Sequence, residues 1–179
     1  YRELIAALAE DGLTVARVWA LGEGVETADS WFRNYLLFRA GPYGFIEDTY
    51  VALDNVLAMA RLHGIRVMLT LANNWTDYGG APMYLQWTSA PSWGLHHESF
   101  YSHPRTREFY RAGLLKLLTR RNTVTGVMYV DDPTIFAWEL MNESTAFSDR
   151  GLNARVAWVH EMAALIREYD KNHMISAGA

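Results

Sequence analysis

The chain has 179 residues, half of them hydrophobic, with a net charge of -4 and no cysteine. This length and composition are enough for one folded domain with a sizeable core. The scattered charges leave no basic stripe, which argues against a nucleic-acid partner. No apolar run approaches the roughly 20 residues that cross a bilayer, so no membrane contact is expected. Without cysteine, disulfides, thiol catalysis and cysteine-ligated metals are excluded.

Helices and strands are predicted to alternate along the chain. The first twelve residues are typical of an amphipathic helix, and Gly64 marks the end of a second helix whose first turn is acidic. Two long insertions, at 21–44 and 78–103, are of the kind that build clefts. Apolar, β-branched runs predict strands, and 3.6-residue periodicity predicts helices. In chain order the elements expected after the first helix are strand 13–20, helix 47–63, strand 65–72, helix 104–121, strand 134–141, helix 152–169 and strand 173–177.

Strands that alternate with helices and are apolar on both faces predict a parallel sheet covered by helices. A doubly wound sheet would carry a glycine-rich turn after its first strand, and "VWALGEGVE" fits that fingerprint poorly. A (β/α)8 TIM barrel places its chemistry at the carboxyl ends of strands, where this chain has Arg17, Trp19, residues 73–75, Asn142 and Glu143. A typical barrel needs roughly 250 residues. We therefore expect a partial barrel of about four to five strands, with residues 1–179 forming one incomplete domain.

Two acids share one face of the strand in "PTIFAWELMNES". Strand alternation puts Glu139 and Glu143 on the same side and Asn142 on the other. Four residues of strand separate the two acids by roughly 13 Å, whereas paired glycosidase carboxylates lie about 5 to 9.5 Å apart. They are therefore not a catalytic pair. A buried Glu139 needs a cation, and Arg17 faces inward by the same parity, so an ion pair between Arg17 and Glu139 is predicted.

Four stretches together resemble the β-mannanases of glycoside hydrolase family 5, in clan A. They are "VARVWA", "LTLANNWTDYGG", "NTVTGVMYVDDPTI" and "DDPTIFAWELMNE", in order and at sensible spacings. The resemblance implies a (β/α)8 barrel that hydrolyses β-1,4-mannosidic bonds by a retaining double displacement, with no metal and no cofactor. It implies β-mannan polysaccharide or manno-oligosaccharides as the binding partner and a secreted, extracellular protein.

The same resemblance assigns roles to individual residues. Glu143 matches the acid/base, Asn142 matches the asparagine that binds the sugar 2-hydroxyl, and Arg17 matches the arginine that supports the nucleophile. The sugar-contacting positions of the cleft match Trp19, Asn74 and Trp75. His96 and His97 are adjacent, so their side chains point apart, and the sequence offers them no convincing third metal ligand.

Two departures from the family pattern stand out. The family reads Asn-Glu-Pro-Arg where this chain has Ser144 and Thr145 after Glu143, which affects binding on the leaving-group side. No remaining acid matches the family's nucleophile, and strand one and the last three strands of a barrel have no counterpart. The chain is therefore expected to be an inactive part of a mannanase, whose open sheet edges favour self-association. A β-1,4-glucanase of the same clan and a noncatalytic carbohydrate-binding protein remain as alternatives.

Overall fold

A parallel sheet lies at the centre of the protein. The computed structural model describes residues 2–25, 37–89 and 97–178. Each central strand pairs in parallel with the next one along the chain, which confirms the predicted parallel sheet. The order across this sheet is β1 (Val15–Trp19), β4 (Arg66–Thr70), β5 (Ile135–Glu139) and β6 (Met174–Ser176).

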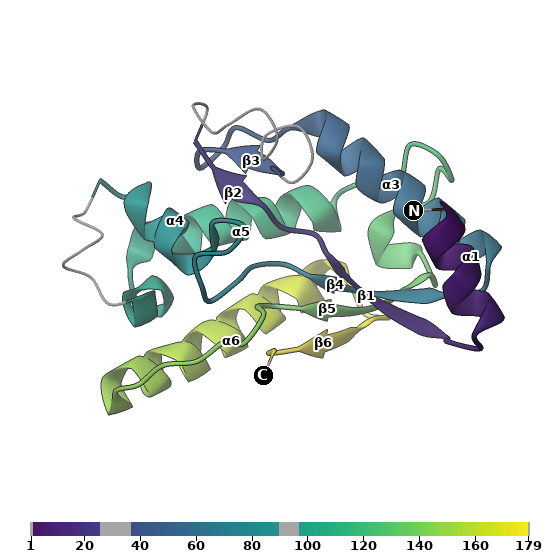
Figure 1. The fold of residues 1–179 in the computed structure, drawn as a ribbon. Coiled ribbons are helices and arrows are strands. Elements are labelled where there is room, and N and C mark those ends of the chain that lie inside the picture. The colour runs from purple at the N-terminus through teal and green to yellow at the C-terminus, as the bar shows by residue number, and fades with distance from the viewer. Residues whose placement is uncertain (1, 26–36, 90–96, 179) are drawn as a thin grey trace.

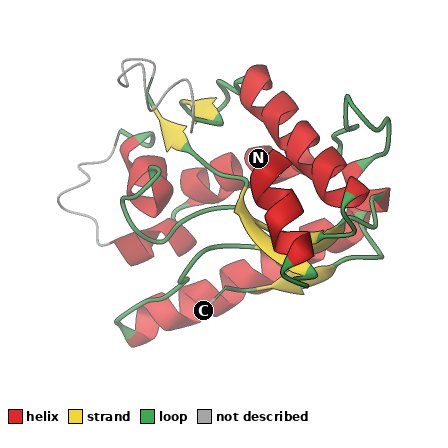
Figure 2. Ribbon diagram, turned by 45° about the vertical axis from the view of Figure 1, so that its right-hand side comes forward, coloured by secondary structure: helices red, strands yellow, loops and turns green. Residues whose placement is uncertain are grey.

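Helices connect these strands, and α3, α5 and α6 gather along the sheet in Figures 1 and 2. No helix among the described residues is both long and apolar enough to cross a membrane. The first insertion contributes a small parallel pair, β2 (Glu23–Gly24) with β3 (Arg39–Ala40). The helices are α1 (Arg2–Glu10), α3 (Glu47–Leu62), α4 (Gly80–Gln86), α5 (Pro104–Leu118) and α6 (Asp149–Tyr169), with 3-10 turns η2 (His97–Tyr101) and η3 (Tyr129–Asp131).

The predicted helices are all present, and one begins earlier than expected. Helix α6 starts at Asp149 rather than at Leu152. Its first turn is capped by Ser148, whose Oγ accepts a hydrogen bond of 3.0 Å from the backbone N–H of Gly151. The capping serine satisfies a backbone donor that would otherwise be unpaired, and it fixes where the helix begins. The apolar periodicity that predicted this helix does not extend into the capped first turn.

The outer strands of the sheet are less buried than their sequences predict. Val15 in β1 is 41% exposed and Met174 in β6 is 50% exposed. Both strands have a hydrogen-bonded neighbour on one side only. The apolar sequence of β1 therefore predicted a buried strand wrongly, because its position at the edge of the described sheet leaves part of it uncovered.

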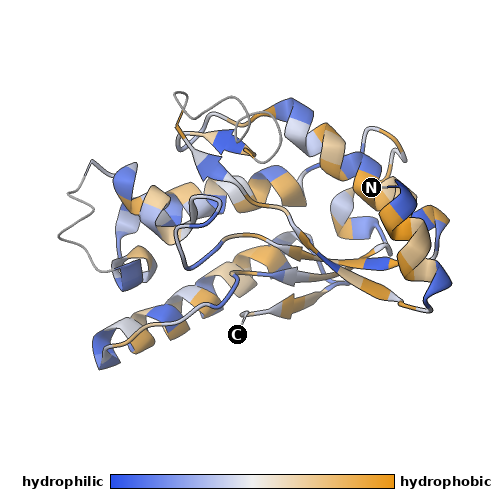
Figure 3. Cartoon of the chain, in the orientation of Figure 1, coloured by the Kyte–Doolittle hydropathy of each residue, from blue (hydrophilic) through white to orange (hydrophobic). Residues whose placement is uncertain are grey.

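The core lies where the helices pack on the inner strands. Figure 3 shows strands that are mostly apolar beside helices that alternate in polarity. Trp158 of α6 is fully buried, with its ring centroid 5.0 Å from that of Tyr110 and 5.6 Å from that of Phe100. These edge-on contacts join α6, α5 and η2, so the second insertion is packed onto the helices through Phe100.

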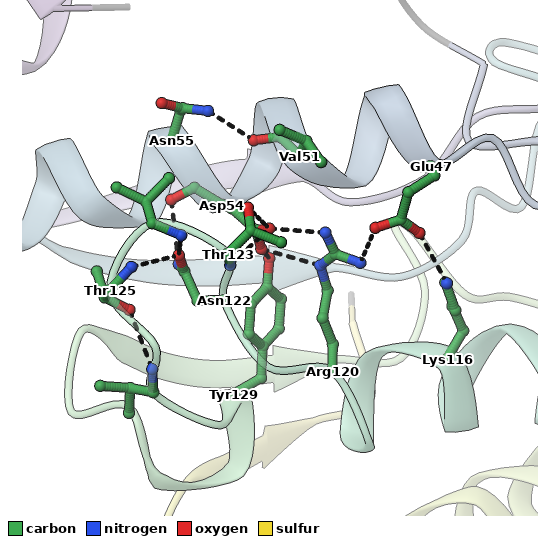
Figure 4. Close-up of polar contacts among 12 residues, drawn as sticks. Glu47, Val51, Asp54, Asn55, Lys116, Arg120, Asn122, Thr123, Thr125 and Tyr129 are labelled. Atoms are coloured by element: carbon green, nitrogen blue, oxygen red, sulfur yellow. Dashed lines mark hydrogen bonds and ion pairs between the residues drawn. The ribbon is translucent and has the colours of Figure 1, made fainter.

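A buried polar cluster fastens α3 to the segment that leads into β5 (Figure 4). Both carboxylate oxygens of Asp54 accept hydrogen bonds from the Arg120 guanidinium, at 2.9 and 2.6 Å. The Tyr129 hydroxyl donates to the same carboxylate at 2.7 Å, and Thr123 donates through its N–H and its hydroxyl. Burial acts to raise the pKa of Asp54, but these hydrogen bonds outweigh it and hold the pKa below its usual value.

We predict that Asp54→Asn lowers the free energy of unfolding by about 3 kcal/mol, since it leaves the buried Arg120 guanidinium with only the exposed carboxylate of Glu47 as an anionic partner. Urea unfolding followed by circular dichroism measures the change. Asp48→Asn, an exposed position on the same helix, is the matched control and should alter stability by less than about 0.5 kcal/mol. Equal stability of the two variants would contradict the importance of the cluster.

Candidate active site

The carboxyl ends of β1, β4 and β5 meet around one guanidinium. Arg17 donates from Nε to Glu139 Oε2 at 2.8 Å, and its Nη2 lies 2.6 Å from the same oxygen. Thr70 Oγ1 donates to this oxygen at 2.5 Å, from the register position opposite Glu139. Glu139 is buried, whereas the Arg17 side chain is 41% exposed. The predicted ion pair is therefore present, and it reaches from the sheet interior to the surface.

Arg17 also holds Asn142, which corrects the predicted alternation. Its Nη2 donates to Asn142 Oδ1 at 2.8 Å, so Asn142 and Glu139 face the same guanidinium. Strict strand alternation placed them on opposite faces and is wrong beyond Glu139, because β5 ends there. Asn142 instead forms an isolated parallel bridge with Asn73, and its Nδ2 donates to Asn73 Oδ1 at 3.0 Å.

Glu143 lies in the turn after β5, at the carboxyl edge of the sheet, in a backbone conformation that few residues other than glycine adopt. Its φ is +48°, in the left-handed region. The side chain is exposed, and Oε2 accepts a hydrogen bond from the indole Nε1 of Trp75. Strain of this kind is found where the surrounding structure fixes a functional group. The turn therefore brings Glu143 to the loop that follows β4.

Aromatic rings lie beside both Arg17 and Glu143. The ring of Trp19 lies 5.4 Å from that of Tyr78, and the Arg17 guanidinium lies 5.2 Å from the centre of the Trp19 ring. Trp75 is 38% exposed, with its ring 5.6 Å from that of His97. Flat apolar faces with a polar edge suit sugar rings. The predicted cleft residues Trp19 and Trp75 thus lie next to the polar side chains of Arg17 and Glu143.

The two asparagines after β4 have different environments. Asn73 contacts Asn142, as described above, and its Nδ2 donates to the backbone oxygen of Asp77 at 3.0 Å. Asn74 is fully buried and accepts a hydrogen bond of 3.0 Å from the Tyr101 hydroxyl. A sugar contact by Asn74 stays a prediction, since in this structure the side chain supports the loop from beneath.

The loop that carries Trp75 and Tyr78 is fastened to β2. The backbone N–H of Glu23 donates to Tyr78 O at 2.8 Å. Gly79 and Gly80 have φ of +95° and +57°. A Cβ on Gly79 would lie 2.1 Å from Glu23 O, and one on Gly80 would lie 2.0 Å from Trp75 O. Only glycine permits this close approach, so the pair fixes the loop beside the site.

The Glu23 carboxylate lies buried beneath the same loop. It accepts a hydrogen bond of 3.0 Å from the Tyr84 hydroxyl and one of 3.4 Å from the Gly80 N–H. Burial raises the pKa of Glu23 to about 7, against the opposing effects of the Arg39 charge and these hydrogen bonds. Glu23 therefore changes its charge near neutral pH while holding the loop.

Most of the predicted site residues come together, and several partners were missed. Arg17, Asn142, Glu143, Trp19 and Trp75 form one contiguous group. Asn74 joins it through its backbone N–H, which donates to Asn142 O at 3.2 Å. Of the two histidines for which the sequence offered no third metal ligand, His97 lies against Trp75, and His96 falls outside the described residues. The described part of the chain holds no group of three side chains placed to bind a metal ion. Asn73 was expected at the carboxyl end of its strand, and the structure places it against Asn142. The partners that sequence reasoning missed are Thr70, Glu23 and Tyr101, of which only Thr70 could have been found, from strand register.

The comparisons with known proteins agree on one family. A model of the glycoside hydrolase family 5 β-mannosidase-like proteins matches residues 2–179. Mannan endo-1,4-beta-mannosidase 1 of Oryza sativa subsp. japonica is 42% identical over 177 residues, which are 97% of this chain and 39% of that protein. Mannan endo-1,4-beta-mannosidase 2 of Arabidopsis thaliana is 38% identical, over 98% of this chain and 39% of that protein. The chain thus spans well under half the length of these two relatives.

Solved structures give the same result. The endo-beta-1,4-mannanase from Thermotoga petrophila superposes with a TM-score of 0.85 at 32% identity, covering 99% of this chain and 39% of that one. The endo-1,4-beta-mannanase from Rhizomucor miehei gives a TM-score of 0.83 at 27% identity, over 97% and 50% of the two chains. The four-stranded sheet with its helices is therefore part of a (β/α)8 barrel, as predicted.

A pH dependence of stability follows from Glu23. Because its folded pKa is raised from 4.5 to about 7, its contribution is fully present below pH 4.5 and is lost as the pH rises through 7. Replacing it by neutral glutamine should remove this loss. We predict that Glu23→Gln gains of order 2 kcal/mol relative to the wild type between pH 5 and pH 8.

Urea unfolding of both proteins at the two pH values measures this difference. Glu3→Gln, at an exposed position of α1, is the control and should follow the wild type. A difference between Glu23→Gln and the wild type that does not change with pH would contradict the raised pKa.

Proposed function

The chain belongs to glycoside hydrolase family 5, and on this basis we propose that it carries the acid/base side of a retaining endo-β-1,4-mannanase site. The observation that carries the proposal is the position of Glu143 at the carboxyl edge of the sheet, beside the Arg17–Asn142 pair. The relatives' names support β-1,4-mannan as the substrate.

Glu143 acts twice in this mechanism. As the acid it protonates the glycosidic oxygen when the bond to the leaving sugar breaks, and as the base it then removes a proton from the attacking water. Its carboxylate projects into solvent from a strained turn and has the Trp75 indole as hydrogen-bond donor. That contact orients Oε2, and Oε1 remains to meet the glycosidic oxygen.

Asn142 is oriented for the sugar 2-hydroxyl. Arg17 can only donate hydrogen bonds, so the amide oxygen of Asn142 must face it and Nδ2 must face Asn73. One N–H of Nδ2 is used by Asn73 Oδ1, and the second is available to a ligand. A hydrogen bond to the 2-hydroxyl that strengthens in the oxocarbenium-like transition state supplies several kcal/mol in such enzymes.

The nucleophile is proposed to come from polypeptide outside residues 1–179. A retaining mechanism needs a second carboxylate about 5 to 5.5 Å from the first. Glu139 is the nearest acid along the strand, but its Oε2 is already bound by Arg17 and Thr70. We assign it to positioning Arg17. Coverage of 39% to 50% of the mannanase relatives leaves room for this second carboxylate in a longer polypeptide.

Two further proposals concern the pairing of the open sheet edges and the location of the protein. The outer edges of β1 and β6 are proposed to pair with further strands, either in a longer chain or in a second copy. Light scattering of the purified chain separates these cases, because a monomer contradicts self-association.

A polymeric substrate supports a secreted enzyme, and the presence of the protein in culture supernatant tests this.

The function is tested by joining residues 1–179 to the parts of the Thermotoga petrophila mannanase that precede and follow the matched region. The chimera is expected to hydrolyse soluble mannan faster than cellulose, as measured by reducing-sugar release. Glu143→Gln should lower kcat by roughly 10² to 10⁴, the usual contribution of a general acid–base. Glu168→Gln, exposed on α6, is the control and should retain full activity.

Each other outcome has a definite meaning. Hydrolysis by residues 1–179 alone, abolished by Glu143→Gln, would contradict the external nucleophile. Faster turnover of cellulose would replace the mannanase assignment by a β-1,4-glucanase. Oligosaccharide binding without turnover in the chimera would favour a noncatalytic binding protein.

A further inference from the structure

An open pocket lies beside Glu143, between the turn after it and the start of α6. Its volume is about 370 Å³, within the range of roughly 300 to 1,000 Å³ typical of small-molecule sites. Arg17 and Asn142 are not among its lining residues, so the pocket is separate from the hydrogen-bonded group of Arg17, Glu139 and Asn142. It is lined by Trp75, Glu143, Ser144, Thr145, Leu152 and Arg155.

Arg155 reaches this pocket from the second turn of α6 and is held there by Ser144. Its Nε and Nη2 both donate to Ser144 Oγ, at 3.1 and 2.8 Å. Ser144 is 5% exposed, and its hydroxyl lies 3.0 Å from Ala177 O and 2.9 Å from Gly178 O, to one of which it donates. The serine therefore ties together the turn after Glu143, the end of β6 and the guanidinium.

One edge of the guanidinium is left for a ligand. Nη2 also lies 3.4 Å from Gly178 O, whereas Nη1 has no hydrogen-bond partner within the ranges that the structure describes. Arg155 itself is half-buried. A guanidinium with one edge fixed and the other edge free is preorganised, so it loses little side-chain entropy when it binds a ligand oxygen.

We propose that Arg155, with the Trp75 ring and the Thr145 hydroxyl, binds the sugar unit on the leaving-group side of the scissile bond. This rests on the proposed function, in which Asn142 binds the sugar on one side of the scissile bond and Glu143 protonates the oxygen of that bond. The glycosidic oxygen meets Glu143, so the next sugar must continue past it into the pocket. Nη1 donates to hydroxyl oxygens of a neutral hexose, and the Trp75 face covers its ring.

The departure from the family pattern fits this assignment. Ser144 and Thr145 replace proline and arginine in the turn after Glu143. Proline at position 144 would lack the hydroxyl that accepts both Arg155 donors. In this chain the Arg155 guanidinium, which projects from α6, lies beside the same turn and is held by the Ser144 hydroxyl.

The test is binding of mannotetraose to the 179-residue chain, followed by NMR of the tryptophan indole N–H and backbone amide signals. We expect Arg155→Gln to weaken binding about tenfold, the size expected for hydrogen bonds from a charged donor. The ligand-induced shift of the Thr145 amide should disappear, while shifts at Asn142 persist. Arg150→Gln, exposed in the first turn of the same helix, should bind like the wild type.

A purely structural role is distinguished by a second variant. Arg155→Lys keeps the charge but not the planar fork, and its affinity is expected to fall between those of the wild type and Arg155→Gln. Wild-type affinity in either folded variant overturns the proposal. Binding that is lost in Trp75→Ala but unchanged in Arg155→Gln overturns this inference alone. No binding by the wild-type chain overturns the proposed mannan recognition as well.

Discussion

The geometry of the site depends on a single guanidinium. Arg17 brings together a buried carboxylate, Glu139, and an amide at the surface, Asn142, which come from a strand and from the turn after it. Because arginine can only donate, it fixes the amide orientation as well as the position. The desolvated Glu139 in turn needs this cation. The buried Glu139 carboxylate and the Asn142 amide at the surface are thus connected through Arg17, and neither keeps its position without that contact.

Around this centre the loops are shaped by local backbone constraints rather than by regular structure. The turn at Glu143 adopts positive φ, and the loop after β4 crosses β2 so closely that Gly79 and Gly80 have no room for side chains. Glu23 lies beneath that crossing and senses pH through burial. The sheet therefore fixes the edge at which the proposed site lies, and the loops fix which rings and carboxylates are present there.

The sequence predicted the regular part of the protein well. Apolar runs and helical periodicity located the strands and helices, and parity alone paired Arg17 with Glu139, because both lie inside strands. The prediction failed where strands end: Asn142 left the alternation, and the contact of Trp75 with Glu143 depends on a turn that no periodicity encodes. Glu23 was missed because its burial arises from packing between two insertions distant in sequence.

The Asp54 cluster has a consequence for how such a protein can change over time. Its hydrogen bonds join α3 to residues 120–129, which lead into the amino end of β5, whereas the groups proposed to react lie at the strands' carboxyl ends. Substitutions in the turn after Glu143 leave that cluster intact. Diversification of the proposed sugar preference and retention of fold are therefore largely uncoupled, so a mutant library confined to positions 145 and 155 should consist mostly of folded members.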